Sequence, residues 1–121
     1  MLKPDPQTLI HDADQLLLTA DAEINKAAED AVTHLICHNS RQSIANYLMS
    51  YLLSNGVHLP YPTTLDSLLE KCRTSNAKFN QIDLSKIHCR FKTDDQEYCL
   101  DHKTVDECYR VARQTQELVK N

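Results

Sequence analysis

The sequence has very little glycine and proline. Its 121 residues include one glycine and four prolines, and the prolines fall in two short stretches, positions 4–6 and 60–62. Sandwiches, barrels and Rossmann-type folds need more turn-forming residues than this, whereas the abundant Ala, Leu, Gln, Glu and Lys favour helices. We therefore expect an all-α fold, with residues 1–121 forming a single domain.

Long apolar runs and clusters of basic residues are also missing. No apolar run is longer than Leu16-Leu17-Leu18, and residues 1–6 lack the hydrophobic core of a signal peptide. The net charge of −4 and a pI near 5.8 give no footprint for nucleic acid, and one glycine excludes a glycine-rich phosphate loop. These features predict a cytoplasmic protein with no membrane segment.

The five cysteines include no CxxC pair, and their number is odd. A chain of this size can form a core without disulfides, so reduced thiols are expected. Cys37, Cys72 and Cys108 occupy apolar positions of predicted helices, where cysteine acts as a small hydrophobic residue.

Charge is almost absent from the middle of the chain. Of 13 Lys and Arg and 17 Asp and Glu residues, Arg41 alone lies within 31–65. Residues 34–55 contain no proline or glycine, and Asn55-Gly56 provides the left-handed geometry that ends many helices. The segment is predicted to be a long, mostly buried central helix.

Two faces of this central helix carry different side chains. A core stripe is predicted on one side, made of Cys37, Ile44, Tyr47, Leu48 and Tyr51, with Ile36 and Leu52 at its margins. The opposite side carries the uncharged row Asn39, Gln42, Ser43, Asn46 and Ser50, bordered by Leu35 and Leu53. Such a row is either a partly solvated face or a second interface. We expect a homodimer in which Asn39, Gln42, Asn46 and Ser50 line the interface.

Helix start signals divide the rest of the chain. Asp5-Pro6 predicts a first helix that breaks from the central one between positions 19 and 30. After an extended connector over 57–62, a third helix opens at Thr63 or Thr64 and ends near 75–76. Asp83 is predicted to cap a short helical piece carrying Leu84 and Ile87, and 88–103 to form an exposed loop.

A capping box of Thr104 and Glu107 then starts a last helix that continues to the C-terminus. The expected fold is an up-and-down bundle of four to five helices.

The order of these pieces resembles the HEPN domain family (higher eukaryotes and prokaryotes nucleotide-binding). The resemblance covers residues 9–119 and depends mainly on two segments, 46–57 and 64–72. It implies a small helical bundle, often dimeric, with a nucleotide-linked role and a nucleotidyltransferase as candidate partner. No cofactor is implied.

The RNase members of that family use an Arg followed four to six residues later by a His. Here Arg41 is followed by no His until His58, and no other Arg has a His at that distance. Asn46 and Ser50 also stand where many family members have an acidic and a basic residue. We therefore expect a non-catalytic HEPN-like module with a nucleotide-linked or protein-interaction role. The alternative is a metal-independent RNase with a degenerate site using Arg41 and His38.

Two groups of residues are candidate ligand sites. His34, His38 and Arg41 share one face of the central helix and can form a metal or anion site, although a third metal ligand is missing and two imidazoles bonded to neighbours explain the same pattern. A zinc-binding module is the second alternative. Its ligands would come from His88, Cys89, Cys99, His102 and Cys108, but their spacing is poor, so no metal ligand is assigned.

Overall fold

A computed structural model describes residues 5–26, 33–57, 64–84 and 102–120, without the side chains of 33, 34 and 102–105. Its elements are α1 (Pro6–Ile24), α2 (Thr33–Ser54), α3 (Leu65–Ser75), the 3-10 helix η1 (Ala77–Gln81) and α4 (His102–Lys120). No strand occurs among the described residues, so the prediction of an all-α fold is confirmed. No helix in these ranges is long and apolar enough to cross a membrane.

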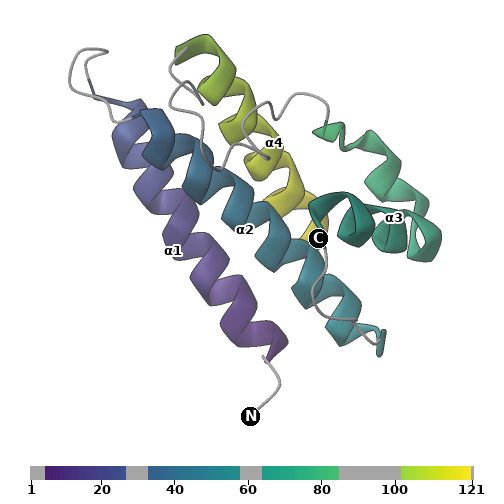
Figure 1. Ribbon diagram of the computed structural model, residues 1–121. Helices are drawn as coiled ribbons and strands as arrows, with labels where there is room; N and C mark the ends of the chain where they lie inside the picture. The colour runs from purple at the N-terminus through teal and green to yellow at the C-terminus, as the bar shows by residue number, and fades with distance from the viewer. Residues whose placement is uncertain (1–4, 27–32, 58–63, 85–101, 121) are drawn as a thin grey trace.

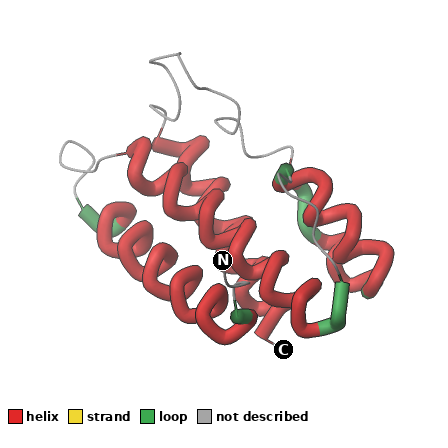
Figure 2. Tube along the Cα trace, turned by 60° about the horizontal axis from the view of Figure 1, so that its bottom comes forward, coloured by secondary structure: helices red, strands yellow, loops and turns green. Residues whose placement is uncertain are grey.

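Helix α2 lies between α1 and α3, with α4 packed against both α1 and α2 (Figures 1 and 2). The hydroxyl of Ser50 donates to the carbonyl oxygen of Pro6 at 2.9 Å, which places the end of α2 beside the start of α1. Tyr109 and Gln116 of α4 donate to Asp21 and Asp14 of α1. The helix α1 therefore runs antiparallel to both α2 and α4.

The core is built around α2, as the sequence predicts. Five of its hydrophobic side chains are completely buried: Ile36, Ile44, Tyr47, Leu48 and Leu52. Cys37 is 2% exposed, and Tyr51 is half-buried against the core. Helix α1 contributes Ala13, Leu17 and Ala20 to the same cluster, in which short side chains allow close packing of the helices.

Capping residues explain where most helices begin and end. Asp5 accepts a hydrogen bond from the Thr8 amide at 3.2 Å, and Thr64 accepts one from the Ser67 amide at 3.0 Å. Both predicted helix starts are confirmed. The predicted break is also confirmed, since α1 ends at Ile24 and α2 begins at Thr33.

A Schellman motif closes α2. The amide of Val57 donates to the carbonyl oxygen of Leu52, and that of Gly56 to Leu53, while Gly56 has a φ of 76°. The predicted end of the central helix is therefore confirmed.

Helix α3 and η1 pack onto the last turns of α2. The rings of Tyr51 and Phe79 meet edge to face, with their centroids 4.7 Å apart. Arg73 donates to the carbonyl oxygen of Ile82 at 2.7 Å, which joins α3 to the residue that follows η1. Sequence reasoning missed η1, whose start is capped by Asn76.

The sequence also misplaces the start of α4. This helix begins at His102, so Thr104 lies inside its first turn instead of before it. An apolar pattern marks where a helix is buried but not how far its first exposed turn extends. The predicted connector beyond Val57, the piece carrying Ile87 and the loop over 88–101 lie outside the described residues.

The expectation of reduced cysteines is wrong for Cys37. This residue is disulfide-bonded. Cys72 and Cys108 are buried and form no disulfide, as expected. Disulfides are typical of oxidising compartments, so the disulfide of Cys37 does not favour the cytoplasmic location expected from the sequence.

Candidate functional site

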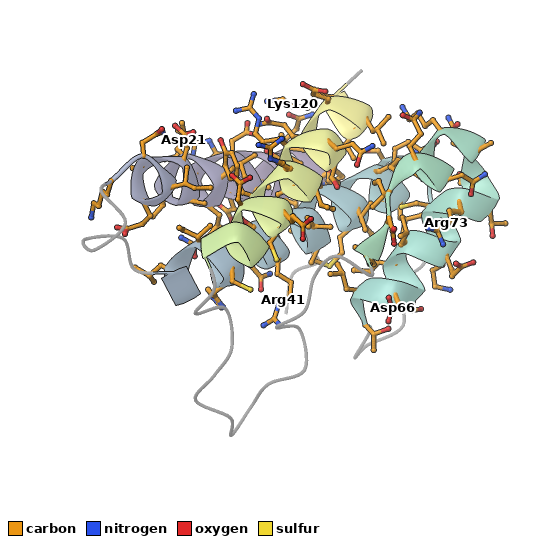
Figure 3. All side chains as sticks on the ribbon, turned by 90° about the horizontal axis from the view of Figure 1, so that it is seen from above. Asp21, Arg41, Asp66, Arg73 and Lys120 are labelled. Carbon is orange, nitrogen blue, oxygen red and sulfur yellow. The ribbon has the colours of Figure 1, made fainter. Side chains whose placement is uncertain are left out.

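The predicted anion site is described in part. His38 is exposed on α2, Arg41 is half-buried, and the side chain of His34 is not described. Arg41 lies on the opposite edge of the bundle from Asp21 and Lys120 (Figure 3). A shared face for the three residues stays a prediction from helical spacing.

The zinc hypothesis depends mostly on residues that the structure does not describe. Cys108 is completely buried in the core, whereas Cys89, Cys99 and the side chain of His102 are outside the described part. In the described ranges no group of three or more His, Cys, Asp or Glu residues is placed to hold a metal ion. The hypothesis therefore stays untested.

The uncharged row predicted as a dimer interface is largely covered within the chain. Asn39 and Asn46 are each 7% exposed, and Ser50 is 1% exposed. Ser50 bonds to the start of α1, and Asn46 accepts a hydrogen bond from Gln42 at 3.2 Å. Because α1 packs on this side, Gln42 is the one predicted interface residue of the four that is exposed.

A different face of α2 remains at the surface. We call it the α2 outer stripe; its members recur every three or four residues and are Leu35, His38, Gln42, Ala45, Met49 and Leu53. His38 and Gln42 are exposed, and the other four are half-buried. The stripe carries no Lys, Arg, Asp or Glu along its whole length.

A partly buried polar cluster joins α1, α2 and α4 at Asp14. Tyr47 donates its hydroxyl hydrogen to Asp14, and Gln116 donates to Asp14 Oδ1 at 3.1 Å and to the Tyr47 hydroxyl oxygen at 2.9 Å. Lys120 Nζ lies 2.9 Å from Asp14 Oδ2. Tyr47 is completely buried, so its hydroxyl has lost its contact with water, and the cluster supplies hydrogen-bond partners in place of water.

The cluster also fixes the protonation of its members. Partial burial alone would raise the pKa of Asp14, but the hydrogen bonds from Tyr47, Lys120 and Gln116 outweigh it and lower the pKa of this carboxyl. Burial and the neighbouring Asp14 raise the pKa of Tyr47 well above its usual value. Tyr47 therefore remains a protonated donor, and the arrangement suits structural support better than proton transfer.

Tyr109 and Asp21 form a second contact of the same kind. The Tyr109 hydroxyl donates to Asp21 Oδ1 at 2.7 Å, and Arg113 lies 3.5 Å from the same hydroxyl. Burial, followed by the hydrogen bond to Asp21, raises the pKa of Tyr109. Sequence periodicity places each tyrosine on a buried face but gives no signal for its acidic partner on another helix.

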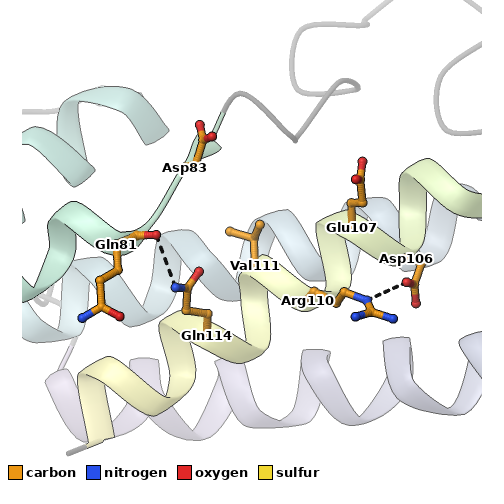
Figure 4. Close-up of a pocket in the computed structure, with 7 residues that line it drawn as sticks. All are labelled: Gln81, Asp83, Asp106, Glu107, Arg110, Val111 and Gln114. Carbon is orange, nitrogen blue, oxygen red and sulfur yellow. Dashed lines mark hydrogen bonds and ion pairs between the residues drawn. The ribbon is translucent and has the colours of Figure 1, made fainter.

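A pocket of about 680 Å³ lies between the end of η1 and α4 (Figure 4). Its lining consists of Gln81, Asp83, Asp106, Glu107, Arg110, Val111 and Gln114. Arg110 Nε lies 2.7 Å from Asp106 Oδ2, and Gln114 donates to the carbonyl oxygen of Gln81 at 3.3 Å. Three carboxylates beside one guanidinium disfavour a phosphate group here. Sequence reasoning missed this pocket because it missed η1, which forms one wall.

Comparisons with protein-family models, curated proteins and solved structures give no match. The choice among functions therefore depends on the residues themselves.

Proposed function

We propose that this chain is a non-catalytic, HEPN-like helical module with a protein-interaction role, assembling through the α2 outer stripe. The HEPN resemblance adds a nucleotidyltransferase as the candidate partner. The observation that carries the proposal is the absence of charged side chains along an accessible face of α2, over positions 35–53.

The other helices place charges on their accessible faces. Exposed positions carry Asp12 and Lys26 in and just after α1, Glu70 in α3, and Arg113 and Glu117 in α4. One residue in four of the whole chain is Asp, Glu, Lys or Arg, whereas the α2 outer stripe carries none over positions 35–53. Helix α1 has a shorter stripe of the same kind, made of Thr8, His11, Gln15, Leu18 and Ala22. Depletion of charge is the compositional mark of the centre of a protein interface.

A nucleotide-linked role is the other form of the proposal. The sequence offers Arg41, the one guanidinium of α2, as its anion ligand, and the acidic pocket between η1 and α4 disfavours phosphate. The protein-interaction form is preferred because it accounts for the whole stripe, whereas Arg41 lies outside the stripe.

One pair of variants tests the proposed surface. Ala45→Glu places a charge in the middle of the stripe, and Leu18→Glu places one on α1, where Leu18 is 61% exposed. Light scattering after gel filtration would follow self-assembly and binding to a coexpressed nucleotidyltransferase from the same genome. We expect Ala45→Glu to lose self-assembly or binding to the nucleotidyltransferase, and Leu18→Glu to behave like the parent chain. No change in Ala45→Glu would contradict the proposal.

A second measurement separates this module from the RNase alternative. Incubation with labelled RNA is expected to give no cleavage, by the parent chain or by Arg41→Ala. Cleavage by the parent that disappears in Arg41→Ala would replace the interaction role with an enzymatic one.

A further inference from the structure

The turn that follows α2 contains the one asparagine-glycine pair of the sequence. Asn55 and Gly56 are both exposed, and a Cβ atom built on Gly56 meets no atom within 4 Å. An asparagine before a glycine is chemically labile, because no side chain hinders the next backbone nitrogen from attacking the carboxamide. The turn therefore combines a labile pair with free access for the water that completes the reaction.

Hydrogen bonds at the end of α2 hold both reacting groups. Asn55 Nδ2 donates to the Tyr51 carbonyl oxygen at 2.8 Å, so the carboxamide is folded back along the helix. The attacking nitrogen is the Gly56 amide, which donates to the Leu53 carbonyl oxygen at 3.1 Å. Both bonds have to break before the nitrogen can reach the carboxamide carbon. The cap that closes α2 therefore slows the reaction, which requires local opening of the helix end.

We propose that Asn55 is a modification site, converted spontaneously to aspartate and isoaspartate at a rate set by opening of the α2 end. The Gly56 nitrogen loses its proton and bonds to Asn55 Cγ, while the carboxamide nitrogen takes up a proton and leaves as ammonia. Water then adds to one of the two carbonyl carbons of the succinimide ring and breaks the bond from that carbon to the ring nitrogen. Cleavage at Cγ gives aspartate, and cleavage at the backbone carbonyl carbon gives isoaspartate.

The end of α1 has the same arrangement without the glycine. Asn25 is exposed, and its Nδ2 donates to the Asp21 carbonyl oxygen at 2.8 Å, the same length as the corresponding bond of Asn55. The residue after Asn25 is Lys26, whose side chain hinders the approach of its backbone nitrogen to the carboxamide. Asn25 is therefore an internal reference, and Asn55 should react well before it.

Either product weakens the end of α2. Aspartate lacks the donor to the Tyr51 carbonyl oxygen, and it places a negative charge at a helix C-terminus, where the helix dipole disfavours it. Isoaspartate adds a carbon atom to the backbone inside the Schellman motif. Because the Tyr51 ring packs against Phe79, the change extends to the contact between α2 and η1. The reaction releases ammonia and does not reverse, so modified chains accumulate with time.

Peptide mass spectrometry of the full chain, aged at neutral pH either folded or unfolded in guanidinium chloride, tests the proposal. Isoaspartate is distinguished from aspartate by enzymatic methylation of its free carboxyl group. We expect both products at Asn55, formed at least about ten-fold more slowly in the folded chain because local opening limits the reaction. Equal rates in the two samples would overturn control by the cap. A folded chain with neither product at Asn55 after months would overturn the site, and so would conversion of Asn25 at the same rate.

A matched pair of variants tests the cap without changing Asn55 or Gly56. Val57→Pro removes the amide that donates to the Leu52 carbonyl oxygen at 2.9 Å, whereas Val57→Ala keeps this amide and shortens the side chain. With folding checked by circular dichroism, Val57→Pro is expected to convert Asn55 several-fold faster than Val57→Ala. Equal rates in the two folded variants would overturn control by the cap. If Val57→Pro does not fold, the comparison of folded and unfolded parent chain still decides the proposal.

Discussion

At the scale of single residues, Asp14 is the group on which three helices converge. It accepts hydrogen bonds from Tyr47 of α2 and Gln116 of α4, and it pairs with Lys120. Its side chain is 27% exposed, so water reaches the carboxylate while the Tyr47 hydroxyl depends on protein partners. Removing the Tyr47 hydroxyl should therefore be the change in this cluster that lowers the free energy of unfolding most.

Tyr47→Phe is expected to lower the free energy of unfolding by about 1–2 kcal/mol. The change removes a donor to a charged acceptor and leaves the ring packing intact. Urea unfolding followed by circular dichroism measures the loss. The matched control is Tyr51→Phe, because the Tyr51 hydroxyl makes no hydrogen bond in the described structure. Equal losses in the two variants would contradict a special role for the Asp14 contact.

Ser40 makes a second prediction at this scale. It is completely buried in α2, and its Oγ has no hydrogen-bond partner among the described residues. A buried hydroxyl without a partner pays for its lost hydration, so Ser40→Ala should leave stability unchanged or raise it by up to about 1 kcal/mol. Ser43→Ala is the contrast, because Ser43 Oγ donates to the Ser40 carbonyl oxygen at 2.8 Å. A melting temperature that drops more in Ser40→Ala than in Ser43→Ala would show that Ser40 is satisfied in solution.

At the scale of elements, the end of α2 depends on one glycine. Gly56 has a φ of 76°, and a Cβ atom built there meets no atom within 4 Å. The cost of Gly56→Ala is therefore conformational and not steric, and about 1–2 kcal/mol of stability should be lost. Gly56→Asn should lose less, since asparagine tolerates this conformation better. Equal urea midpoints for the parent and Gly56→Ala would contradict this account.

The elements that the sequence predicts well are those with local signals. Asp5 with Pro6, Thr64, and Gly56 each act on atoms within a few residues, so their positions can be inferred from the sequence alone. The burial of α2 could also be predicted, because Arg41 is the one charged residue within 31–65. The short helix η1 is not predicted, because five residues and an Asn76 cap form too short a pattern to indicate a helix.

The candidate surface could be predicted only in part. Helical spacing gives two faces of α2, but it does not say which of them α1 covers. The sequence therefore predicts Asn46 and Ser50 as interface residues, whereas the structure buries both within the chain. Gln42 belongs both to the predicted interface row and to the α2 outer stripe. Ala45 and Met49 could not be recognised as accessible without the position of α1.

At the scale of the whole molecule, the polar contacts between helices gather on α1 and α4. Asp14 and Asp21 of α1 face Gln116, Lys120 and Tyr109 of α4. Between α2 and α3, buried hydrophobic side chains pack together, and the Cys72 thiol makes a weak contact with the Leu48 carbonyl oxygen. Titration should therefore affect the two sides of α2 differently.

The loss of stability at alkaline pH depends on groups that the fold keeps protonated. Burial raises the pKa of Cys72 to about 12, from 9.0 in an unfolded chain. Burial and Asp14 raise the pKa of Tyr47 above its usual 10.0. For a raised pKa, the stabilising effect is complete below the unfolded value and is lost as pH rises towards the folded value. Stability should therefore fall above about pH 9, first through the thiol and then through the phenol.

Urea unfolding at pH 8 and pH 10 tests this order with Cys72→Ala and Tyr47→Phe. Each group with a raised pKa lowers the free energy of unfolding by about 1.4 kcal/mol per pH unit once that group ionises in the unfolded chain. The Cys72 thiol should therefore account for most of the loss at pH 10. Cys72→Ala should be less stable at pH 8 because of the cavity it leaves, yet it should lose less between the two values than the parent. Tyr47→Phe should keep nearly the parent slope below pH 10, because the unfolded phenol is still mostly protonated there. A parent whose urea midpoint is the same at pH 8 and pH 10 would contradict a raised pKa for the Cys72 thiol in the folded chain.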